Sequence, residues 1–500
     1  MNGHLLGTLI DALPDLTVVG GASTDGVCIS DITLDSRRVG ESAIFVALPG
    51  TRDHGARFVD QAIAAGAAAI LTDSEGVELI GDCAAPVLVA KNVRRSMADL
   101  ACRVFNSPSE QMLSFGVTGT NGKTTTIFLL EGALSAAGFR VGTVGTLGMR
   151  LDGQTLPSVT STITTPESPD LQRSLMQLLD AGADALAMEV SSHALVLDRV
   201  RGINFDVTGF TNLGRDHLDF HHTQEAYFEA KAQLFTPAYT SKAVIFVADE
   251  AGPQMVERAR QAGLEVRTVG WTERCDYQLA AWRPDPSGGA QLSMQWANRS
   301  VDLHIELPGE YNVANAALAI GMLDFAGIDI DSALDGISRA QAPGRMQRVS
   351  LGSRAPIVYV DFAHTPQAIQ SALAALPGRI IAVFGAGGDR DSSKRELMGE
   401  VAAKGADLVI VTDDNPRSEI PGAIRQQVLA GAQLGWRASE ILDGKDRRSA
   451  IRLALQKANP GDTIAILGKG HEATQEINGE LIEFDDSAVV SAEWDLISGG

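Results

Sequence analysis

An eleven-residue stretch at 116–126, Gly-Val-Thr-Gly-Thr-Asn-Gly-Lys-Thr-Thr-Thr, constrains this chain more than any other feature. It follows a short apolar run at 112–115 and precedes a helical pattern, which predicts a strand, a glycine-rich turn and a helix. Such a turn directs backbone N–H groups and a helix N-terminus at one point, which suits a polyphosphate. Lys123 can neutralise phosphate charge, and the Thr124 hydroxyl can ligate Mg²⁺. Val117 stands where the strict G-x-x-x-x-G-K-[ST] pattern has its first glycine, so an ordinary glycine-rich turn is the alternative.

The length and composition indicate a globular α/β protein of several domains. A chain of 500 residues is expected to form roughly three domains. Hydrophobic residues make up 45% and aromatic residues 5%, which favours tightly packed α/β layers. The formal net charge of −21 argues against nonspecific nucleic-acid binding, because phosphates would be repelled on average.

The cysteines and the terminal sequence indicate a cytoplasmic protein. The four cysteines are scattered without a C-x-x-C motif, so neither a zinc site nor a disulfide framework is expected. The N-terminus lacks a basic segment followed by a long apolar core, which argues against a signal peptide. No run approaches the ~20 apolar residues that span a bilayer, so we expect no membrane insertion.

Strands and helices alternate along three predicted domains. The first, 1–106, has strands at 43–48, 68–71 and 87–89 and ends at a polar linker. The second, 107–342, contains the phosphate turn, and its βα alternation predicts a mostly parallel sheet covered on both faces. A small antiparallel extension is expected at 277–307. The third, 343–500, follows Pro-Gly-Arg and predicts an open doubly wound sheet. Its strands are expected near 357–361, 379–384, 408–412 and 463–467.

Polar residues at strand ends of the second domain are candidates for chemistry. Glu189 ends an apolar strand, where a carboxylate near the phosphate turn can hold Mg²⁺ together with Thr124. A capping or surface glutamate is the alternative. His217 lies in a polar segment that follows the next apolar run, and it either binds metal, orients substrate or is a surface residue. Lys231 lies in a helical segment, where the pattern alone favours a solvated side chain.

His221 and His222 have no such support, and we expect them on the surface.

The third domain places polar stretches after its strands. They occupy 361–366, 385–391, 413–417 and 468–472. Since each follows an apolar strand, all can face one crevice. Arginine binds carboxylates through two hydrogen bonds, and Asp or Glu can hold an ammonium group. The crevice therefore suits a zwitterionic amino acid, with a set of unrelated turns as the alternative.

Six motifs together resemble those of the Mur ligase family, the ATP-dependent amide ligases that build the peptide of bacterial peptidoglycan. The resemblance covers essentially the whole chain and implies three domains: a uridine-nucleotide domain, a P-loop central domain and a doubly wound C-terminal domain. Asp-Asn-Pro-Arg at 414–417 is the family's marker for meso-diaminopimelate rather than lysine. The motifs occupy 118–125, 188–193, 216–219, 309–315, 343–346 and 414–417.

The resemblance also implies a role for individual residues. Those expected to contact ATP are Gly119, Thr120, Asn121, Gly122, Lys123, Thr124, Thr125, Asn312, Arg345, Asp361 and His364. Those expected to hold Mg²⁺ are Thr124, Glu189, His217 and Lys231, with Lys231 as N6-carboxylysine. The expected catalytic residues are Lys123, Glu189, His217 and Lys231. Those expected to contact UDP-N-acetylmuramoyl-dipeptide are Leu34, Ser36, Thr51, Arg52, Asp53, Thr164, Thr165, Ser191 and Arg199. Those expected to contact diaminopimelate are Arg390, Asp414, Asn415, Pro416, Arg417, Gly468 and Glu472.

The reaction implied by the resemblance is the ATP-dependent addition of meso-2,6-diaminopimelate to UDP-N-acetylmuramoyl-L-alanyl-D-glutamate through an acyl phosphate. It would serve peptidoglycan precursor synthesis in the cytoplasm, with ATP and Mg²⁺ as cofactors, and we expect a monomer. Because ATP and the amino acid bind to different domains, catalysis is expected to need domain closure. The alternatives are a folylpolyglutamate synthetase-like ligase, a ligase that adds lysine, and a nucleotide-dependent switch without ligase chemistry.

Overall fold

The structure is a computed structural model that describes residues 3–20, 22–50, 53–157, 163–297, 299–352 and 354–499. Its contacts divide the chain into two compact units. The first comprises 1–123, 134–269 and 318–330, and the second comprises 124–133, 270–317 and 331–500. The three predicted domains, 1–106, 107–342 and 343–500, differ from these units in their bounds and stay a prediction.

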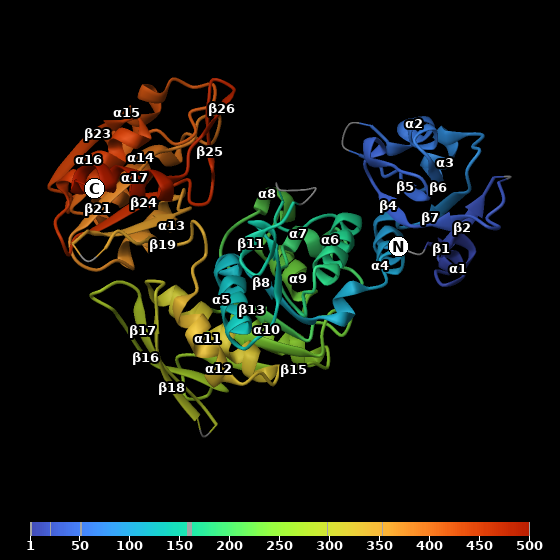
Figure 1. The fold of residues 1–500 in the computed structure, drawn as a ribbon, viewed down its shortest axis with the longest axis horizontal. Coiled ribbons are helices and arrows are strands. Elements are labelled where there is room, and N and C mark those ends of the chain that lie inside the picture. Colours follow the sequence, from blue (N-terminus) through green and yellow to red (C-terminus); the bar gives the residue numbers. More distant parts are fainter. Residues whose placement is uncertain are drawn as a thin grey trace. The chain divides into compact units, whose positions relative to one another are not determined.

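The N-terminal part of the first unit is a small sheet with helices packed on it (Figure 1, blue). Strands β4 to β7 run parallel, which is the usual result of alternating strands and helices, and β2 is antiparallel to β7. The strand order is β2 (Leu16–Val19), β7 (Val87–Ala90), β6 (Ala67–Thr72), β5 (Ala43–Val46) and β4 (Asp31–Thr33). The other elements are β1 (His4–Leu5), β3 (Cys28–Ile29), α1 (Leu6–Asp11), α2 (Val59–Ala64), α3 (Ser74–Ile80) and α4 (Val93–Val104).

The rest of the first unit is built on a predominantly parallel sheet. Strands β9, β12, β8, β13, β14 and β15 pair in parallel, and β10 and β11 continue the sheet as an antiparallel ribbon beside β9. The strands in order are β11 (Gln154–Thr155), β10 (Gly148–Leu151), β9 (Val141–Gly145), β12 (Ala185–Glu189), β8 (Leu113–Thr118), β13 (Val207–Phe210), β14 (Lys242–Phe246) and β15 (Glu265–Gly270). The helices of this part are α6 (Ser168–Asp180), α7 (Ser192–Val196), α8 (Leu218–His221), α9 (Gln224–Ala232) and α10 (Ala251–Gln261). Residues of α5 (Lys123–Ala136) and of α11 (Glu310–Phe325) are divided between the two units.

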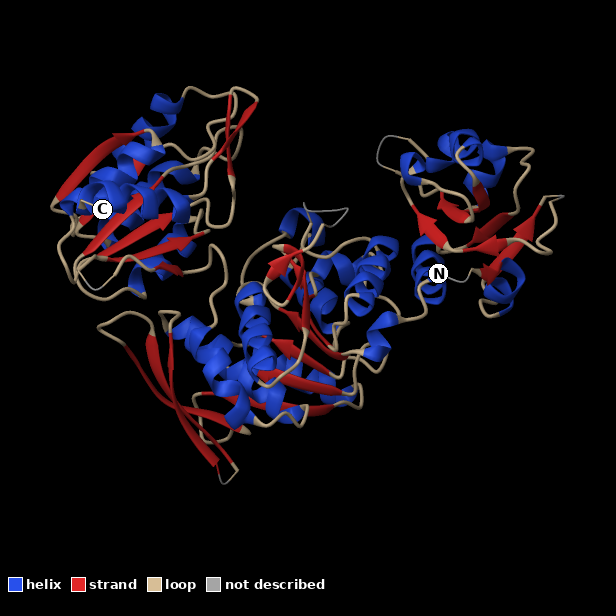
Figure 2. Cartoon of the chain, viewed as in Figure 1, coloured by secondary structure: helices blue, strands red, loops and turns tan. Residues whose placement is uncertain are grey.

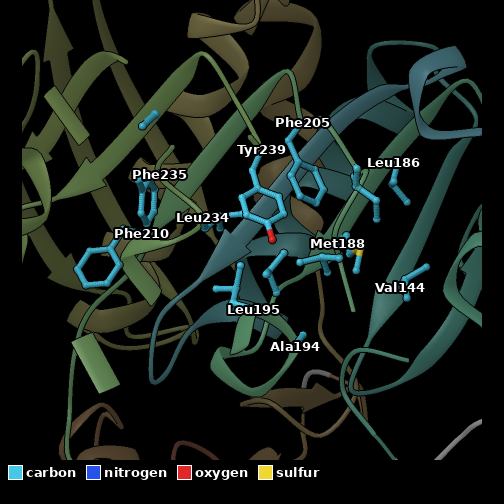
Figure 3. Packing of buried hydrophobic residues seen from close by; sticks show 14 of the residues in the cluster. Val144, Leu186, Met188, Ala194, Leu195, Phe205, Phe210, Leu234, Phe235 and Tyr239 are labelled. Carbon is cyan, nitrogen blue, oxygen red and sulfur yellow. The ribbon is translucent and has the colours of Figure 1, made fainter. Parts of the chain in front are cut away.

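One face of this sheet carries a large apolar core. Leu186 and Met188 alternate along β12 and point to the same side, as the two-residue period of a strand requires. Figure 3 shows them beside Leu195 of α7 and the rings of Phe205 and Tyr239. Because β12 is buried on both faces, its sequence is a continuous apolar run that ends at Glu189.

The second unit contains the antiparallel extension predicted at 277–307. Its strands are β16 (Tyr277–Pro284), β17 (Ala290–Trp296) and β18 (Arg299–Ile305), which Figure 2 shows as a long ribbon. Along β17, Leu292 and Met294 are buried while their neighbours are more exposed, so the alternating sequence forms one apolar face. Helix α12 (Ile330–Arg339) follows α11.

The C-terminal sheet is doubly wound, as predicted. Ala382 and Phe384 of β21 pack into a core with α13, α14 and α15, whereas Ile381 and Val383 pack into a second core with α16 and α17. The strands in order are β19 (Gln347–Val349), β20 (Ile357–Asp361), β24 (Thr463–Leu467), β21 (Ile380–Phe384), β22 (Leu408–Thr412) and β23 (Glu440–Lys445), all parallel except β19. The helices are α13 (Pro366–Ala374), α14 (Lys394–Gly405), α15 (Pro421–Ala432), α16 (Arg447–Lys457) and α17 (Asp486–Ser498), and β25 (Thr474–Ile477) pairs with β26 (Glu480–Glu483).

Across the parts of the chain that the structure describes, no helix combines the length and the apolar character needed to cross a membrane.

Candidate active site

The predicted phosphate turn lies between β8 and α5. Gly119 has φ +149° and Gly122 has φ +88°, conformations that side chains rarely adopt. A Cβ at Gly119 would lie 1.9 Å from Thr211 Oγ1, so only glycine fits there. The strand–turn–helix order that the sequence predicts is therefore confirmed.

The polar segment after β13 holds this turn. The Thr120 backbone N–H donates to the Asn212 carbonyl at 2.9 Å, and the Asn121 N–H donates to Asn212 Oδ1 at 3.0 Å. The Thr211 hydroxyl donates to the Asn121 carbonyl at 2.6 Å. These residues fix the turn from the neighbouring strand end, a role that the sequence did not assign to them.

The two lysines of the expected catalytic set meet at this turn. Lys123 Nζ donates to the carbonyls of Gly119 and Thr120 at 2.9 and 3.0 Å, and Lys231 Nζ donates to the Gly119 carbonyl at 2.7 Å. Thr124 and Thr125 follow in the first turn of α5 and are buried. The ammonium of Lys123 is thus placed at the turn, as expected of a phosphate-binding lysine.

Lys231 is buried rather than solvated, with 1% of its surface exposed. Its Nζ also lies 4.4 Å from the centre of the Tyr227 ring. Burial, together with the nearby charge of Lys123, lowers the pKa of Lys231 well below its ordinary value. A lysine in this state has a greater share of the neutral, nucleophilic amine at neutral pH.

Glu189 is a buried residue at the carboxyl end of β12, so the alternative of a surface glutamate is wrong. Its carboxylate accepts hydrogen bonds from the Thr146 backbone N–H at 2.8 Å and from the Thr146 hydroxyl at 3.2 Å. The Thr165 hydroxyl donates to the Glu189 carbonyl at 3.0 Å. Glu189 is therefore a fixed carboxylate at the strand edge where ligands of α/β sheets collect.

His217 begins a cluster of aromatic rings, and His221 is part of that cluster. The rings of His217 and His193 are centred 4.7 Å apart. The prediction that His221 lies on the surface is wrong: the residue is buried, and its Nε2 lies 2.9 Å from the Ser192 hydroxyl. His221 lies in the short helix α8, and its ring packs against the Tyr227 ring. Burial lowers the pKa of His221 to about 4. His222 is exposed, as predicted.

The residues expected to contact the muramyl dipeptide gather beside Glu189. Arg199 donates from Nη1 to the Thr165 carbonyl at 3.2 Å, and the Ser191 N–H donates to Thr165 Oγ1 at 3.2 Å. Thr164 Oγ1 lies 3.4 Å from Thr146 Oγ1. Glu167 accepts from Arg199 Nε at 3.0 Å and orients it, a role that no sequence pattern predicted.

The residues expected to contact uridine lie in the N-terminal part of the first unit. The Ser36 hydroxyl donates to Gln61 Oε1 at 3.2 Å, and Asp53 accepts from Arg57 at 2.6 Å. Leu34 packs against the core of the small sheet. Thr51 and Arg52 lie outside the described residues. The uridine site stays a prediction.

The four polar stretches of the third predicted domain meet at one edge of the C-terminal sheet. The Gly468 N–H donates to the Asp361 carbonyl at 3.0 Å, and Arg417 Nη1 donates to the Gly388 carbonyl at 2.7 Å. Asn415 Nδ2 donates to Glu472 Oε2 at 2.8 Å. The first two contacts link the ends of neighbouring strands, and the third links the segments after β22 and β24, which flank β21, so the alternative of unrelated turns is wrong.

The expected amino-acid residues at this edge combine both charges. Asp414, Asn415 and Pro416 are buried, whereas Arg390 is exposed. Arg417 has φ +51°, and its Nε lies 3.3 Å from Glu476 Oε2. Gly468 has φ +114°, and a Cβ there would lie 2.5 Å from Asp414 Oδ2, so the glycine lets this backbone approach the carboxylate.

The expected nucleotide contacts of the second unit lie partly at the same edge. Asp361 accepts from the N–H groups of Met346 and Ala363 at 2.7 and 2.8 Å, and burial raises its pKa. The Arg345 guanidinium lies 4.8 Å from the centre of the Phe362 ring.

His364 and Asn312 complete this set. His364 is exposed, and its Nδ1 lies 2.9 Å from the Phe362 carbonyl. Asn312 is buried at the start of α11, and its Nδ2 donates to the Pro308 carbonyl at 2.8 Å.

His471 makes the stability of the fold sensitive to acid. Burial, aided by the charge of Arg345, lowers its pKa from 6.5 to about 4. Between these two values the unfolded chain binds more protons, so stability is lost as the pH falls from 6.5 to 4. We expect this residue to account for at most about 3 kcal/mol of that loss. Urea unfolding at pH 7 and pH 4 should show a smaller acid loss for His471→Gln; equal losses would contradict the assignment.

Oxygen donors of the kind that Mg²⁺ prefers occur among the residues expected to bind the ion. Among the described residues, no group of three or more His, Cys, Asp or Glu side chains is arranged to hold a metal ion. Magnesium is commonly held by one or two carboxylates together with substrate phosphates. The buried carboxylate of Glu189 and the hydroxyl of Thr124 are ligands of the appropriate oxygen type.

Three family models match the chain in succession. They are the Mur ligase family, catalytic domain at 29–104, the Mur ligase middle domain at 117–323 and the Mur ligase, glutamate ligase domain at 344–470. The UDP-N-acetylmuramoyl-L-alanyl-D-glutamate–2,6-diaminopimelate ligase of Corynebacterium glutamicum is 44% identical, over 93% of this chain and 91% of the relative.

Solved structures agree with these matches. A structure of a UDP-N-acetylmuramoyl-L-alanyl-D-glutamate–2,6-diaminopimelate ligase aligns over 100% of both chains with a TM-score of 0.74 and 32% identity. The MurF ligase from Thermotoga maritima in complex with ADP aligns over 94% of this chain and 98% of that chain, with a TM-score of 0.60 and 19% identity. The second likeness is one of fold alone.

The fold and these matches define an ATP-dependent, ADP-forming amide ligase. The chain belongs to the Mur ligase family.

Proposed function

We propose that this enzyme joins meso-2,6-diaminopimelate to the D-glutamate residue of UDP-N-acetylmuramoyl-L-alanyl-D-glutamate and converts ATP to ADP and phosphate. The observation that carries this proposal is the segment 414–417, Asp-Asn-Pro-Arg, at the carboxyl edge of the C-terminal sheet beside Glu472 and Gly388. The printed name of the Corynebacterium relative, with 44% identity, supports the same substrates.

The first step activates a carboxylate that is otherwise a poor acylating agent. An oxygen of the D-glutamate γ-carboxylate attacks the γ-phosphorus of ATP, the bond to the β,γ-bridging oxygen breaks, and ADP leaves. Phosphoryl transfer of this kind depends mainly on positioning and on charge neutralisation. The backbone of the turn at 119–122 would cradle the phosphates, and the ammonium of Lys123 would neutralise part of their charge.

The residues proposed to hold Mg²⁺ are Thr124, Glu189, His217 and Lys231 as its carbamate. When bound, the ion would neutralise the clustered phosphate and carboxylate oxygens. The lowered pKa of Lys231 supports the modification, because a neutral amine can attack CO₂ and form N–COO⁻ with release of a proton. The fixed carboxylate of Glu189 supports its role as the second anionic ligand.

The second step forms the amide. The uncharged amine of diaminopimelate attacks the acyl carbon, the bond from that carbon to the phosphate oxygen breaks, and the nitrogen loses a proton. Arg390 and Arg417 would bind the carboxylates of the amino acid, while Asp414 and Glu472 would hold its distant ammonium group. Such a site distinguishes diaminopimelate from lysine by the second carboxylate.

Replacing Arg417 by alanine is expected to raise the KM for meso-diaminopimelate by about tenfold to a hundredfold, because one charge-assisted carboxylate contact is lost. The KM for ATP should stay within about twofold. Steady-state kinetics with each substrate varied in turn measures both values. Arg339→Ala, which removes an exposed arginine paired with Asp335, is the matched control. Equal rises in both KM values would refute the assigned role.

Product analysis tests the function as a whole. The enzyme is incubated with ATP, Mg²⁺ and the UDP-linked dipeptide, with meso-diaminopimelate or L-lysine as the acceptor, and products are separated by mass. We expect UDP-linked tripeptide and an equal amount of ADP with diaminopimelate only. Tripeptide formation with lysine alone would identify a lysine-adding ligase, and ATP hydrolysis without either substrate would favour a nucleotide switch.

The proposed reaction also suggests where the enzyme works. Its UDP-linked substrate and ATP are consumed in precursor synthesis for peptidoglycan, so we propose a cytoplasmic enzyme that supports cell shape and division. A monomer stays a prediction.

A further inference from the structure

Lys469 is a buried cation that the proposed mechanism does not use. It follows β24 in the segment Gly468-Lys469-Gly470-His471-Glu472, and none of its side-chain surface is exposed. Burying an ammonium group costs several kcal/mol unless it is paired and hydrogen-bonded. The contacts of Lys469 therefore indicate which groups compensate for the burial of its ammonium group.

Those contacts lead to two residues of the amino-acid site. Lys469 Nζ lies 3.2 Å from Glu472 Oε2 and 3.5 Å from Asn415 Oδ1, and it also donates to the Thr474 carbonyl. Asn415 Nδ2 donates to the same Glu472 oxygen at 2.8 Å. Lys469, Asn415 and Glu472 thus form a closed triangle of polar contacts.

The orientation of the Asn415 amide is fixed by the backbone. The Glu476 N–H donates to Asn415 Oδ1 at 2.9 Å, and because an N–H group can only donate, the amide oxygen must face it. Nδ2 is then directed at Glu472. The triangle therefore has one arrangement of donors and acceptors.

Glu472 is held asymmetrically. Both Lys469 and Asn415 engage Oε2, while 37% of the Glu472 side-chain surface is exposed. One oxygen is thus bound to the protein interior, and the carboxylate reaches the surface of the sheet edge where the substrate ammonium is proposed to bind. A carboxylate held in this way loses less rotational freedom when it binds a ligand.

We propose that Lys469 is a positioning residue for the amino-acid site, which acts by holding Glu472, and Asn415 with it, in the geometry that receives the ammonium group of the acceptor. This inference rests on the proposed function. It assigns to Lys469 an effect on acceptor binding and none on ATP binding.

The test is a double-mutant cycle on the full-length enzyme. Lys469→Met, Glu472→Gln and the double variant are compared with the wild type in the KM for meso-diaminopimelate and for ATP. We expect Lys469→Met to raise the acceptor KM about tenfold to a hundredfold and to leave the ATP KM within about twofold. In the Glu472→Gln background, Lys469→Met should add less than about twofold, because its partner is already altered.

The controls separate positioning from folding. Lys404→Met removes a lysine of α14 that pairs with Glu400, and it should leave both KM values unchanged. Should Lys469→Met melt well below the wild type, the cycle is run with Lys469→Gln, which keeps a donor for the Thr474 carbonyl, and the same outcomes decide.

Each outcome bears on one claim. Multiplicative effects of the two substitutions, or equal rises in the acceptor and ATP KM values, overturn the role of Lys469. A wild-type enzyme that does not turn over meso-diaminopimelate overturns the proposed function instead, and with it the basis of this inference.

Discussion

Lys231→Ala is expected to lower kcat by about a thousandfold or more, because it removes the proposed anionic carbamate beside the phosphate turn. The buried position of Lys231, 2.7 Å from the Gly119 carbonyl, leaves space for a small acid once the side chain is shortened. Acetate should therefore restore part of the activity. Phosphate release measured with increasing acetate provides the readout.

The matched control for this substitution is Lys91→Ala, which shortens an exposed lysine of the same unit. A second readout does not depend on activity: wild-type enzyme equilibrated with ¹³C-bicarbonate should show a carbamate resonance that Lys231→Ala lacks. If Lys231→Ala keeps near-normal activity and shows the same carbamate resonance as the wild type, the modified-lysine proposal is wrong.

Lys123→Ala is expected to lower kcat by about a hundredfold to a thousandfold, because the positive charge proposed to neutralise the transferred phosphoryl group is lost. The side chain contacts the carbonyls of Gly119 and Thr120, so it belongs to the turn itself. Single-turnover measurement of acyl-phosphate formation, with Lys91→Ala as control, isolates this step. A normal rate of this step with a changed KM for ATP alone would show that Lys123 binds nucleotide without assisting transfer.

The sequence predicted several strand ends that carry candidate site residues. Apolar runs that end in polar residues gave the strand ends at Glu189 and at 357–361, 408–412 and 463–467, and the last three agree with β20, β22 and β24. Since parallel strands share one carboxyl edge, adjacency of the polar loops follows from the topology alone. The contact between Asn415 and Glu472 bears this out.

The features that the sequence did not predict depend on packing between distant segments. Short helix α8 buries His221 against Tyr227, and no local pattern distinguishes it from exposed His222. Glu167 orients Arg199 across 32 positions of sequence, and Lys469 approaches Asn415 across 54. Local propensity carries no information about such pairs, because they form only when the sheet brings the loops together.

The most direct test of carboxylate activation follows an oxygen atom from the D-glutamate γ-carboxylate to the released phosphate. UDP-linked dipeptide labelled with ¹⁸O in the D-glutamate γ-carboxylate is incubated with ATP, meso-diaminopimelate and the wild-type enzyme, and the released phosphate is analysed by mass. If the carboxylate is activated as an acyl phosphate, each phosphate released carries one ¹⁸O from the substrate. Tripeptide formed together with unlabelled phosphate would contradict the central claim that ATP activates this carboxylate directly.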